Sequence, residues 1–163
     1  MKLTGIHIKN FKAIHEMKID SIENALILVG QNNTGKTTIL EAIRAAFGDY
    51  HISAEDFDGD CANIEMDLSL EFSIEDLKWL HQNGIVSQYK RYETWLEDFC
   101  KKLPSFSVNE GESGGVLQFT FIAHRDGWVR YQDGERLHAL SGRLLSHRHA
   151  LWFHIPCIFN RRI

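Results

Sequence analysis

The chain has 163 residues, of which 44% are hydrophobic and 25% are charged, and its formal net charge is −4. This composition is too apolar for a disordered chain and too charged for a membrane protein, and the length favours one domain with a real core. Three widely spaced cysteines, Cys61, Cys100 and Cys157, exclude a disulfide framework and a CxxC zinc site. The N-terminus shows no signal-peptide pattern, and the longest apolar run, residues 25–29, is too short to cross a bilayer. We therefore expect a cytoplasmic protein without a membrane partner and without a global basic field for nucleic acid, although a local basic patch stays open.

The first 50 residues predict three strands, a loop and a helix. Ile6 and Ile8 alternate with polar residues, and residues 17–19 repeat the alternation, which indicates two half-exposed strands. Residues 25–29 are continuously apolar, as is typical of a central strand covered on both faces. After a loop, apolar residues recur at helical spacing over residues 39–47, and a glycine follows in the position that ends a helix.

The middle of the chain predicts a strand followed by two helices. Residues 63–72 alternate most cleanly and indicate an antiparallel strand with one face in solvent. Ser73 and Asp76 have the spacing of a capping box that opens a short helix. The next helix ends at a proline and carries Tyr89 and Tyr92 on an aromatic stripe that we expect in the core.

The last third predicts a hairpin, a helix and a final strand. Residues 117–121 alternate, a turn follows at 125–127, and residues 128–131 return. Residues 136–150 are expected to be helical, and residues 151–156 form a last apolar strand.

One segment fits the phosphate-binding pattern G-x-x-x-x-G-K-[ST] at every position. Its glycines allow a sharp turn that places backbone N–H groups around a β-phosphate, while Lys36 supplies a charge to the β- and γ-phosphates and the Thr37 hydroxyl coordinates Mg²⁺. The helix that follows aims its N-terminal donors at the same anion. The alternative is an ordinary Gly/Asn-rich turn with an exposed lysine. The predicted nucleotide-binding residues of this loop are Gly30, Gln31, Asn32, Asn33, Thr34, Gly35, Lys36, Thr37 and Thr38.

A second, weaker pattern follows the first helix. Asp56 to Gly59 spell D-x-x-G, but the N-K-x-D guanine reader of GTPases is absent from the sequence. Asp56, Asp58 and Asp60 also suggest a calcium loop, in which the glycine and the closing glutamate would be misplaced. We therefore expect a solvated surface loop here.

Residues 8–14 (I-K-N-F-K-A-I) and 29–43 (V-G-Q-N-N-T-G-K-T-T-I-L-E-A-I) together resemble the N-terminal half of an SMC/RecF-like ATPase of the ABC superclass, most closely the OLD (overcoming lysogenization defect) family and related AAA-labelled ATPases of phage defence and DNA repair. The resemblance is dense over about the first 50 residues. It reappears at residues 54–57, similar to an acidic D-F step, and more weakly at residues 153–157 with Arg161, similar to an I-P-x-x-R strand.

The resemblance implies a head that binds ATP and Mg²⁺, with two heads sandwiching two nucleotides in a homodimer that acts on DNA. It also implies that a Walker B Asp-Glu and an L-S-G-G signature lie in a later lobe, beyond a coiled coil, with a Toprim nuclease domain after it in OLD proteins. By the same resemblance, Lys12 would lie near the phosphate or ribose of the nucleotide. A solvated lysine at a strand end is the alternative for Lys12.

The second half of such a site is not recognisable in this chain. Residues 66–71 alternate instead of ending in Asp-Glu, and residues 140–143 (L-S-G-R) match a signature only by coincidence, since no strand with that carboxylate pair follows. Gln118 and Gln132 are conceivable Q-loop glutamines, but neither stands out. A basic C-terminal end with three histidines and three arginines either contacts DNA phosphates or forms a plain surface helix and strand.

These observations predict an α/β fold of the P-loop NTPase class, an ABC/SMC-like N-terminal lobe with antiparallel strands and flanking helices. Residues 1–163 would form the N-terminal portion of the ATPase domain, with the nucleotide-binding strands, loop and first helix in 1–50 and a β/α lobe in 51–163, ending before Walker B. The catalytic residues stay unknown. A stand-alone nucleotide- or anion-binding module without turnover is the second hypothesis, and a small kinase, which would need an arginine-rich lid, is the third.

Overall fold

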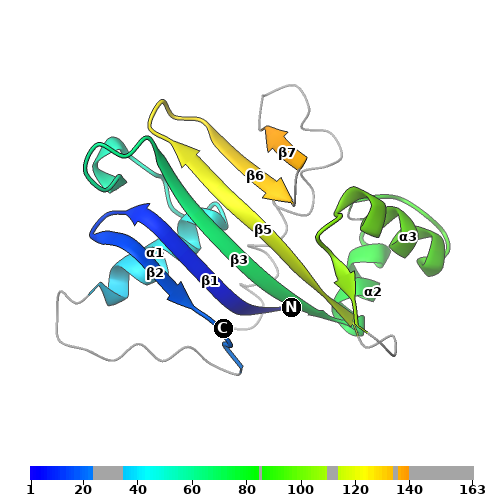
Figure 1. Ribbon diagram of the computed structural model, residues 1–163. Coiled ribbons are helices and arrows are strands. Elements are labelled where there is room, and N and C mark those ends of the chain that lie inside the picture. The colour runs from blue at the N-terminus through cyan, green and yellow to red at the C-terminus, as the bar shows by residue number, and fades with distance from the viewer. Residues whose placement is uncertain (24–34, 85, 110–113, 134–135, 140–163) are drawn as a thin grey trace.

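An antiparallel sheet forms the centre of the fold (Figure 1). The computed structural model describes residues 1–23, 35–84, 86–109, 114–133 and 136–139. Within these residues the strands lie in the order β2-β1-β3-β5-β6-β7, and β4 pairs with β5. The strands are β1 (Lys2–Phe11), β2 (Ile14–Ile19), β3 (Asn63–Ser73), β4 (Ser107–Val108), β5 (Gly114–His124), β6 (Val129–Asp133) and β7 (Arg136–Ala139).

The helices gather at two places on this sheet. Helix α1 (Lys36–Ala46) packs on β1, behind the sheet in the view of Figure 1, and the 3-10 turn η1 (Ala54–Asp56) follows it. Helices α2 (Ile74–Gln82) and α3 (Tyr92–Lys102) pack on each other at the far end, where β3 ends and β5 begins. None of the helices that the structure describes has the length and apolar character needed to cross a membrane.

The alternating strands bury one face of the sheet and leave the other polar, because successive side chains of a strand point to opposite faces. On β3, Met66 and Leu68 are at most 2% exposed while Asp67 between them is exposed. The apolar faces of β1, β3 and β5 stand in register and form one core with α1, whose Ala42 is completely buried. The predicted antiparallel strand with one face in solvent is thus confirmed.

Several local predictions also hold. Ser73 caps α2, since its Oγ accepts a hydrogen bond from the Asp76 N–H at 3.2 Å and the Asp76 carboxylate accepts one from the Ser73 N–H at 2.9 Å. Helix α1 ends where a glycine was expected to end it, with Gly48 at φ +82°. The predicted hairpin is formed by β5 and β6, joined by the turn around Gly127.

Two predictions are wrong. Residues 136–139 do not begin a helix but form β7, because β6 offers an unpaired edge and its hydrogen bonds outweigh the local preference. Tyr89 is 44% exposed and precedes α3, so it is not a core residue. Its carbonyl accepts a hydrogen bond from His81 Nε2 at 2.8 Å, which holds the chain outside the helix.

The predicted strands at residues 25–29 and 151–156, Cys157 and the rest of the predicted helix up to residue 150 lie outside the described residues. The described cysteines Cys61 and Cys100 are free thiols.

Candidate functional site

The end of the phosphate-binding loop stands at the start of α1. Gly35 occupies the N-cap position in the left-handed conformation, at φ +83°, where a side chain would be strained. Lys36 is the first helical residue, and Thr37, the predicted Mg²⁺ ligand, is exposed. The first five predicted residues of the loop, Gly30, Gln31, Asn32, Asn33 and Thr34, lie outside the described residues.

The N-terminus of α1 is built to receive an anion. The first backbone hydrogen bond of the helix joins the Ile39 N–H to the Gly35 carbonyl at 3.1 Å, so the helix itself supplies no acceptor for the N–H groups of residues 36–38. Gly35 has no side chain with which to cap the helix, and the first turn of α1 carries no acidic residue. Since the positive end of the helix dipole adds to these donors, the described part of the loop fits a phosphate group.

Lys12 lies in the tight β1–β2 turn, beside the second turn of α1. Its ammonium Nζ contacts Glu41 Oε2 at 2.7 Å and Asp56 Oδ1 at 3.4 Å, and it lies 5.0 Å from the ring centre of Tyr50. Glu41 follows Lys36 by five residues, which is about 7.5 Å of helix rise. The Lys12 side chain therefore joins the β1–β2 turn to the flank of α1, the helix that follows the predicted nucleotide-binding loop, and we call it a clamp. It is not a solvated lysine at a strand end. The hydrogen bonds to Glu41 and Tyr50 raise the pKa of Lys12 above its ordinary value, although burial by itself would lower it.

Asp56 is a residue whose position sequence reasoning missed. The expected solvated loop is wrong at this residue, which is only 4% exposed. Its carboxylate accepts hydrogen bonds from the Tyr50 hydroxyl at 2.8 Å, the Ser53 N–H at 2.7 Å and the Ser53 hydroxyl at 3.0 Å. The S-x-x-D spacing of Ser53 and Asp56, the same as that of Ser73 and Asp76, was the signal that could have found this cap.

The electrostatics of Asp56 follow from these contacts. Burial by itself would raise the pKa of the carboxyl, but the hydrogen bonds from Ser53 and Tyr50 and the charge of Lys12 outweigh it. The pKa of Asp56 is consequently held below its ordinary value, and the group is ionised at neutral pH.

Backbone contacts also join the Lys12 turn to this loop. The Lys12 N–H donates to the Asp56 carbonyl at 2.7 Å, and the Asp58 N–H donates to the Asn10 carbonyl at 3.1 Å. The β1–β2 hairpin, α1 and η1 are thus held as one unit next to the loop that was predicted to bind the nucleotide.

The other sequence candidates do not join this unit. Gln118 and Gln132 stand on the polar face of β5 and β6, whereas α1 covers the apolar face, so the structure does not bring them to the start of α1. The L-S-G-R segment and the basic C-terminal end, including His147, His149 and His154, lie outside the described residues. In the part of the chain that is described, no group of three or more His, Cys, Asp or Glu side chains could hold a metal ion.

Short segments of the chain are similar in sequence to known proteins. Over 43 residues the chain is 54% identical to the DNA replication and repair protein RecF of Lactococcus lactis subsp. lactis, a match that covers 26% of this chain and 12% of that protein. Over 38 residues it is 47% identical to the uncharacterized protein MJECL10 of Methanocaldococcus jannaschii, covering 23% of this chain and 17% of that protein. The matched segments thus span less than a fifth of these relatives' own lengths.

The fold and the family are shown by two further comparisons. A solved structure from work on the structural biochemistry of ATP-driven dimerization and DNA stimulated activation of SMC ATPases superimposes with a TM-score of 0.52 at 18% identity, covering 85% of this chain and 73% of that chain. This likeness confirms the expected mixed α/β fold, with an SMC head-like antiparallel sheet and flanking helices. The model of the AAA ATPase domain matches residues 1–118. The chain therefore belongs to the AAA ATPase domain family, and this membership implies that it binds ATP.

Proposed function

We propose that this chain is the ATP-binding N-terminal lobe of an SMC/RecF-like ATPase of the OLD type, and that it binds ATP with Mg²⁺ through residues 30–38. The observation that carries the proposal is the start of α1 at Lys36, directly after the left-handed N-cap Gly35 and before Thr37, in the spacing of a phosphate-binding loop. Backbone N–H groups at this helix start and the Lys36 ammonium would hold the phosphates, and the Thr37 hydroxyl would coordinate Mg²⁺.

Lys12 enters the proposal from the side of α1. Its place beside Glu41, in the second turn of α1, supports a position next to the phosphate or ribose of the bound nucleotide. The ammonium already contacts two carboxylates, Glu41 and Asp56, so a direct contact with the nucleotide would exchange one of them for phosphate. In either arrangement Lys12 fixes the β1–β2 turn against the helix that carries the loop.

For the whole protein we propose that ATP binding brings two heads together around two nucleotides and that this controls an action on DNA, in repair or in defence against phages. The likeness to SMC ATPases, described as showing ATP-driven dimerization, and the similarity to RecF, named for DNA replication and repair, support this proposal. A Walker B Asp-Glu, a signature segment and, in an OLD-type protein, a nuclease domain would lie outside the segments of this chain that resemble the family.

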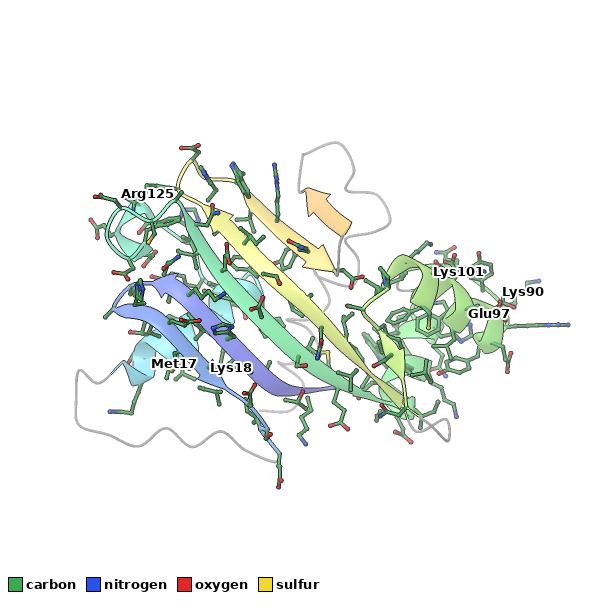
Figure 2. All side chains as sticks on the ribbon, viewed as in Figure 1. Met17, Lys18, Lys90, Glu97, Lys101 and Arg125 are labelled. Carbon is green, nitrogen blue, oxygen red and sulfur yellow. The ribbon has the colours of Figure 1, made fainter. Side chains whose placement is uncertain are left out.

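Nucleotide binding is tested by comparing the wild-type chain with Lys36→Ala in a titration with a fluorescent ATP analogue and Mg²⁺. We expect the affinity to fall at least about tenfold, because the variant loses a charge-assisted contact to the β- and γ-phosphates. Lys90→Ala is the matched control, since Lys90 is exposed and lies at the α3 end of the molecule, far from α1 (Figure 2). Equal affinities of wild type and Lys36→Ala would refute the proposal.

A stand-alone module that binds anions without turnover is the competing function. It predicts that pyrophosphate displaces the ATP analogue as well as ATP does, and that ATP leaves the chain monomeric. The proposed ATPase lobe predicts a preference for ATP over pyrophosphate and a shift toward dimers when ATP and Mg²⁺ are present, measured by light scattering.

A further inference from the structure

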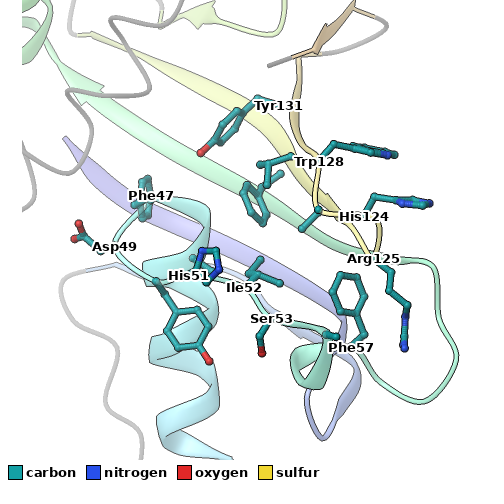
Figure 3. A pocket seen from close by; sticks show the side chains of 18 residues that line it. Phe47, Asp49, His51, Ile52, Ser53, Phe57, His124, Arg125, Trp128 and Tyr131 are labelled. Carbon is teal, nitrogen blue, oxygen red and sulfur yellow. The ribbon is translucent and has the colours of Figure 1, made fainter. Parts of the chain in front are cut away.

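A mostly apolar pocket of about 680 Å³ lies between the end of α1 and the β5–β6 hairpin (Figure 3). Because α1 rises about 1.5 Å per residue, Phe47 at the pocket is separated from Lys36 by roughly 16 Å of helix. The pocket is therefore distinct from the predicted phosphate-binding loop. The side chains that form its walls include Phe47, Ile52 and Phe57 on the α1 side and Phe121, Val129 and Tyr131 on the sheet side.

Three polar side chains around this pocket are engaged with the protein, and the side chains of Asp49 and His51 also line it. The Tyr131 hydroxyl donates to the Ala46 carbonyl at 3.1 Å, and the Tyr50 hydroxyl donates to Asp56 at 2.8 Å. Arg125 donates to the carbonyls of Cys61 and Gly59 and lies over the ring of Phe57. The larger share of the walls is apolar surface, including the partly exposed Ile52 and Val129. Since each Å² of apolar surface removed from water contributes about 25 cal/mol, the occupant that gains most here is an apolar one.

The path of the chain leads to the rim of the pocket. In the β6–β7 pair, Ala139 stands opposite Arg130, the neighbour of the wall residue Val129. The described part of β7 therefore ends beside the pocket, with residues 140–163 still to follow. They include the apolar run L-W-F-H-I at residues 151–155. The intervening residues, fully extended, span at most about 40 Å, which is ample for a return to the pocket.

Charge favours the same occupant. Residues 140–163 contain four arginines and no carboxylate, whereas residues 1–139 hold the other 14 basic and all 22 acidic side chains, a formal charge of −8. A basic segment is attracted to this acidic body, and the attraction is strongest over distances within a Debye length of about 8–10 Å.

We propose that residues 151–155 of this same chain dock into the pocket and cover its apolar walls at Ile52 and Val129. The segment closes the apolar gap between α1 and the β5–β6 hairpin, and it joins the end of the nucleotide-loop helix to the last part of the chain. The proposal is independent of nucleotide binding, because it concerns the opposite end of α1.

The first experiment maps the contact directly. In the full chain, Trp152→p-benzoylphenylalanine places a photoreactive group in the segment, and mass spectrometry after irradiation identifies the linked peptide. We expect intramolecular links to peptides covering residues 47–57 or 121–131. Links to the polar sheet face or to α3, links between two copies, or the same links from Leu144→p-benzoylphenylalanine would overturn the proposal.

The second experiment measures hydrogen exchange in full-length variants. Replacing both rings (Trp152→Ser with Phe153→Ser) is expected to speed exchange of the amides in residues 47–54 and 121–131 by about tenfold, without changing β1 or β3. The matched control (Leu144→Ser with Leu145→Ser) leaves these amides unchanged. If the two double variants behave alike, or if the ring variant leaves both peptides as protected as in the wild type, another occupant covers the pocket and the proposal is wrong.

Discussion

The contact of Lys12 with two carboxylates allows a sharp prediction about stability. Lys12→Met keeps the aliphatic stem but removes the ammonium from Glu41 Oε2 at 2.7 Å and from Asp56 Oδ1 at 3.4 Å. Breaking a fully buried ion pair costs about 3–5 kcal/mol, whereas an exposed pair contributes about 0–1 kcal/mol. The Lys12 and Glu41 side chains are 28% and 24% exposed, between these limits. We therefore expect the free energy of unfolding to fall by about 1.5–3 kcal/mol.

Urea unfolding of the full chain, followed by circular dichroism, measures this change. Lys18→Met is the matched control, because Lys18 on the same hairpin pairs with Asp20 at 2.9 Å while both side chains are 62% exposed. We expect the control to lose less than about 0.5 kcal/mol. Equal losses for the two variants would refute the reasoning that the Lys12 contacts are a partly buried clamp.

The pH dependence of the Lys12→Met effect follows from Asp56. The folded-state pKa of Asp56 lies below its ordinary value, so the folded state binds fewer protons there than the unfolded chain, whose pKa is about 3.9. Asp56 therefore contributes stability above about pH 4 that is lost as the pH falls through the folded-state pKa. Because Lys12 is one cause of the lowered pKa, the difference between wild type and Lys12→Met is expected to shrink from pH 7 to pH 3. A difference that stays constant or grows over this range contradicts the assignment.

The remaining predictions concern packing. Gly114→Ala would place a Cβ 1.9 Å from the Phe72 carbonyl oxygen at φ +125°, so we expect a loss above about 3 kcal/mol, against about 1 kcal/mol for Gly127→Ala, where the added Cβ meets open space; similar midpoints of urea unfolding would contradict this. Trp95→Ala removes a completely buried ring from α3 and is expected to cost about 3–5 kcal/mol, whereas the exposed Glu97→Ala changes stability by less than about 0.5 kcal/mol. Thermal unfolding of the two α3 variants measures this difference, and a Trp95→Ala protein as stable as Glu97→Ala would show that α3 does not pack as described.

Features that depend on neighbouring residues could be predicted from the sequence. The period-2 alternation of β3, the capping box of Ser73 and Asp76, and the glycine that ends α1 are local patterns, and each appears in the structure as expected. The phosphate-binding pattern is local in the same sense. Its N-cap Gly35 and the start of α1 at Lys36 agree with it, and its use in binding ATP remains the prediction that Lys36→Ala tests.

Contacts between residues far apart in the sequence could not be predicted in this way and became visible in the folded chain. Residues 136–139 pair with β6 and do not form the predicted helix, because an open sheet edge is a long-range feature that the local sequence does not show. Lys12 reaches Glu41 and Asp56 across 29 and 44 positions of sequence, and these contacts turn a lysine at a strand end into a clamp on α1. Asp56 stays charged although it is buried, because hydrogen bonds and the Lys12 ammonium offset its loss of water. Local patterns record the geometry of single elements, whereas burial and ion pairing depend on elements that meet only when the chain folds.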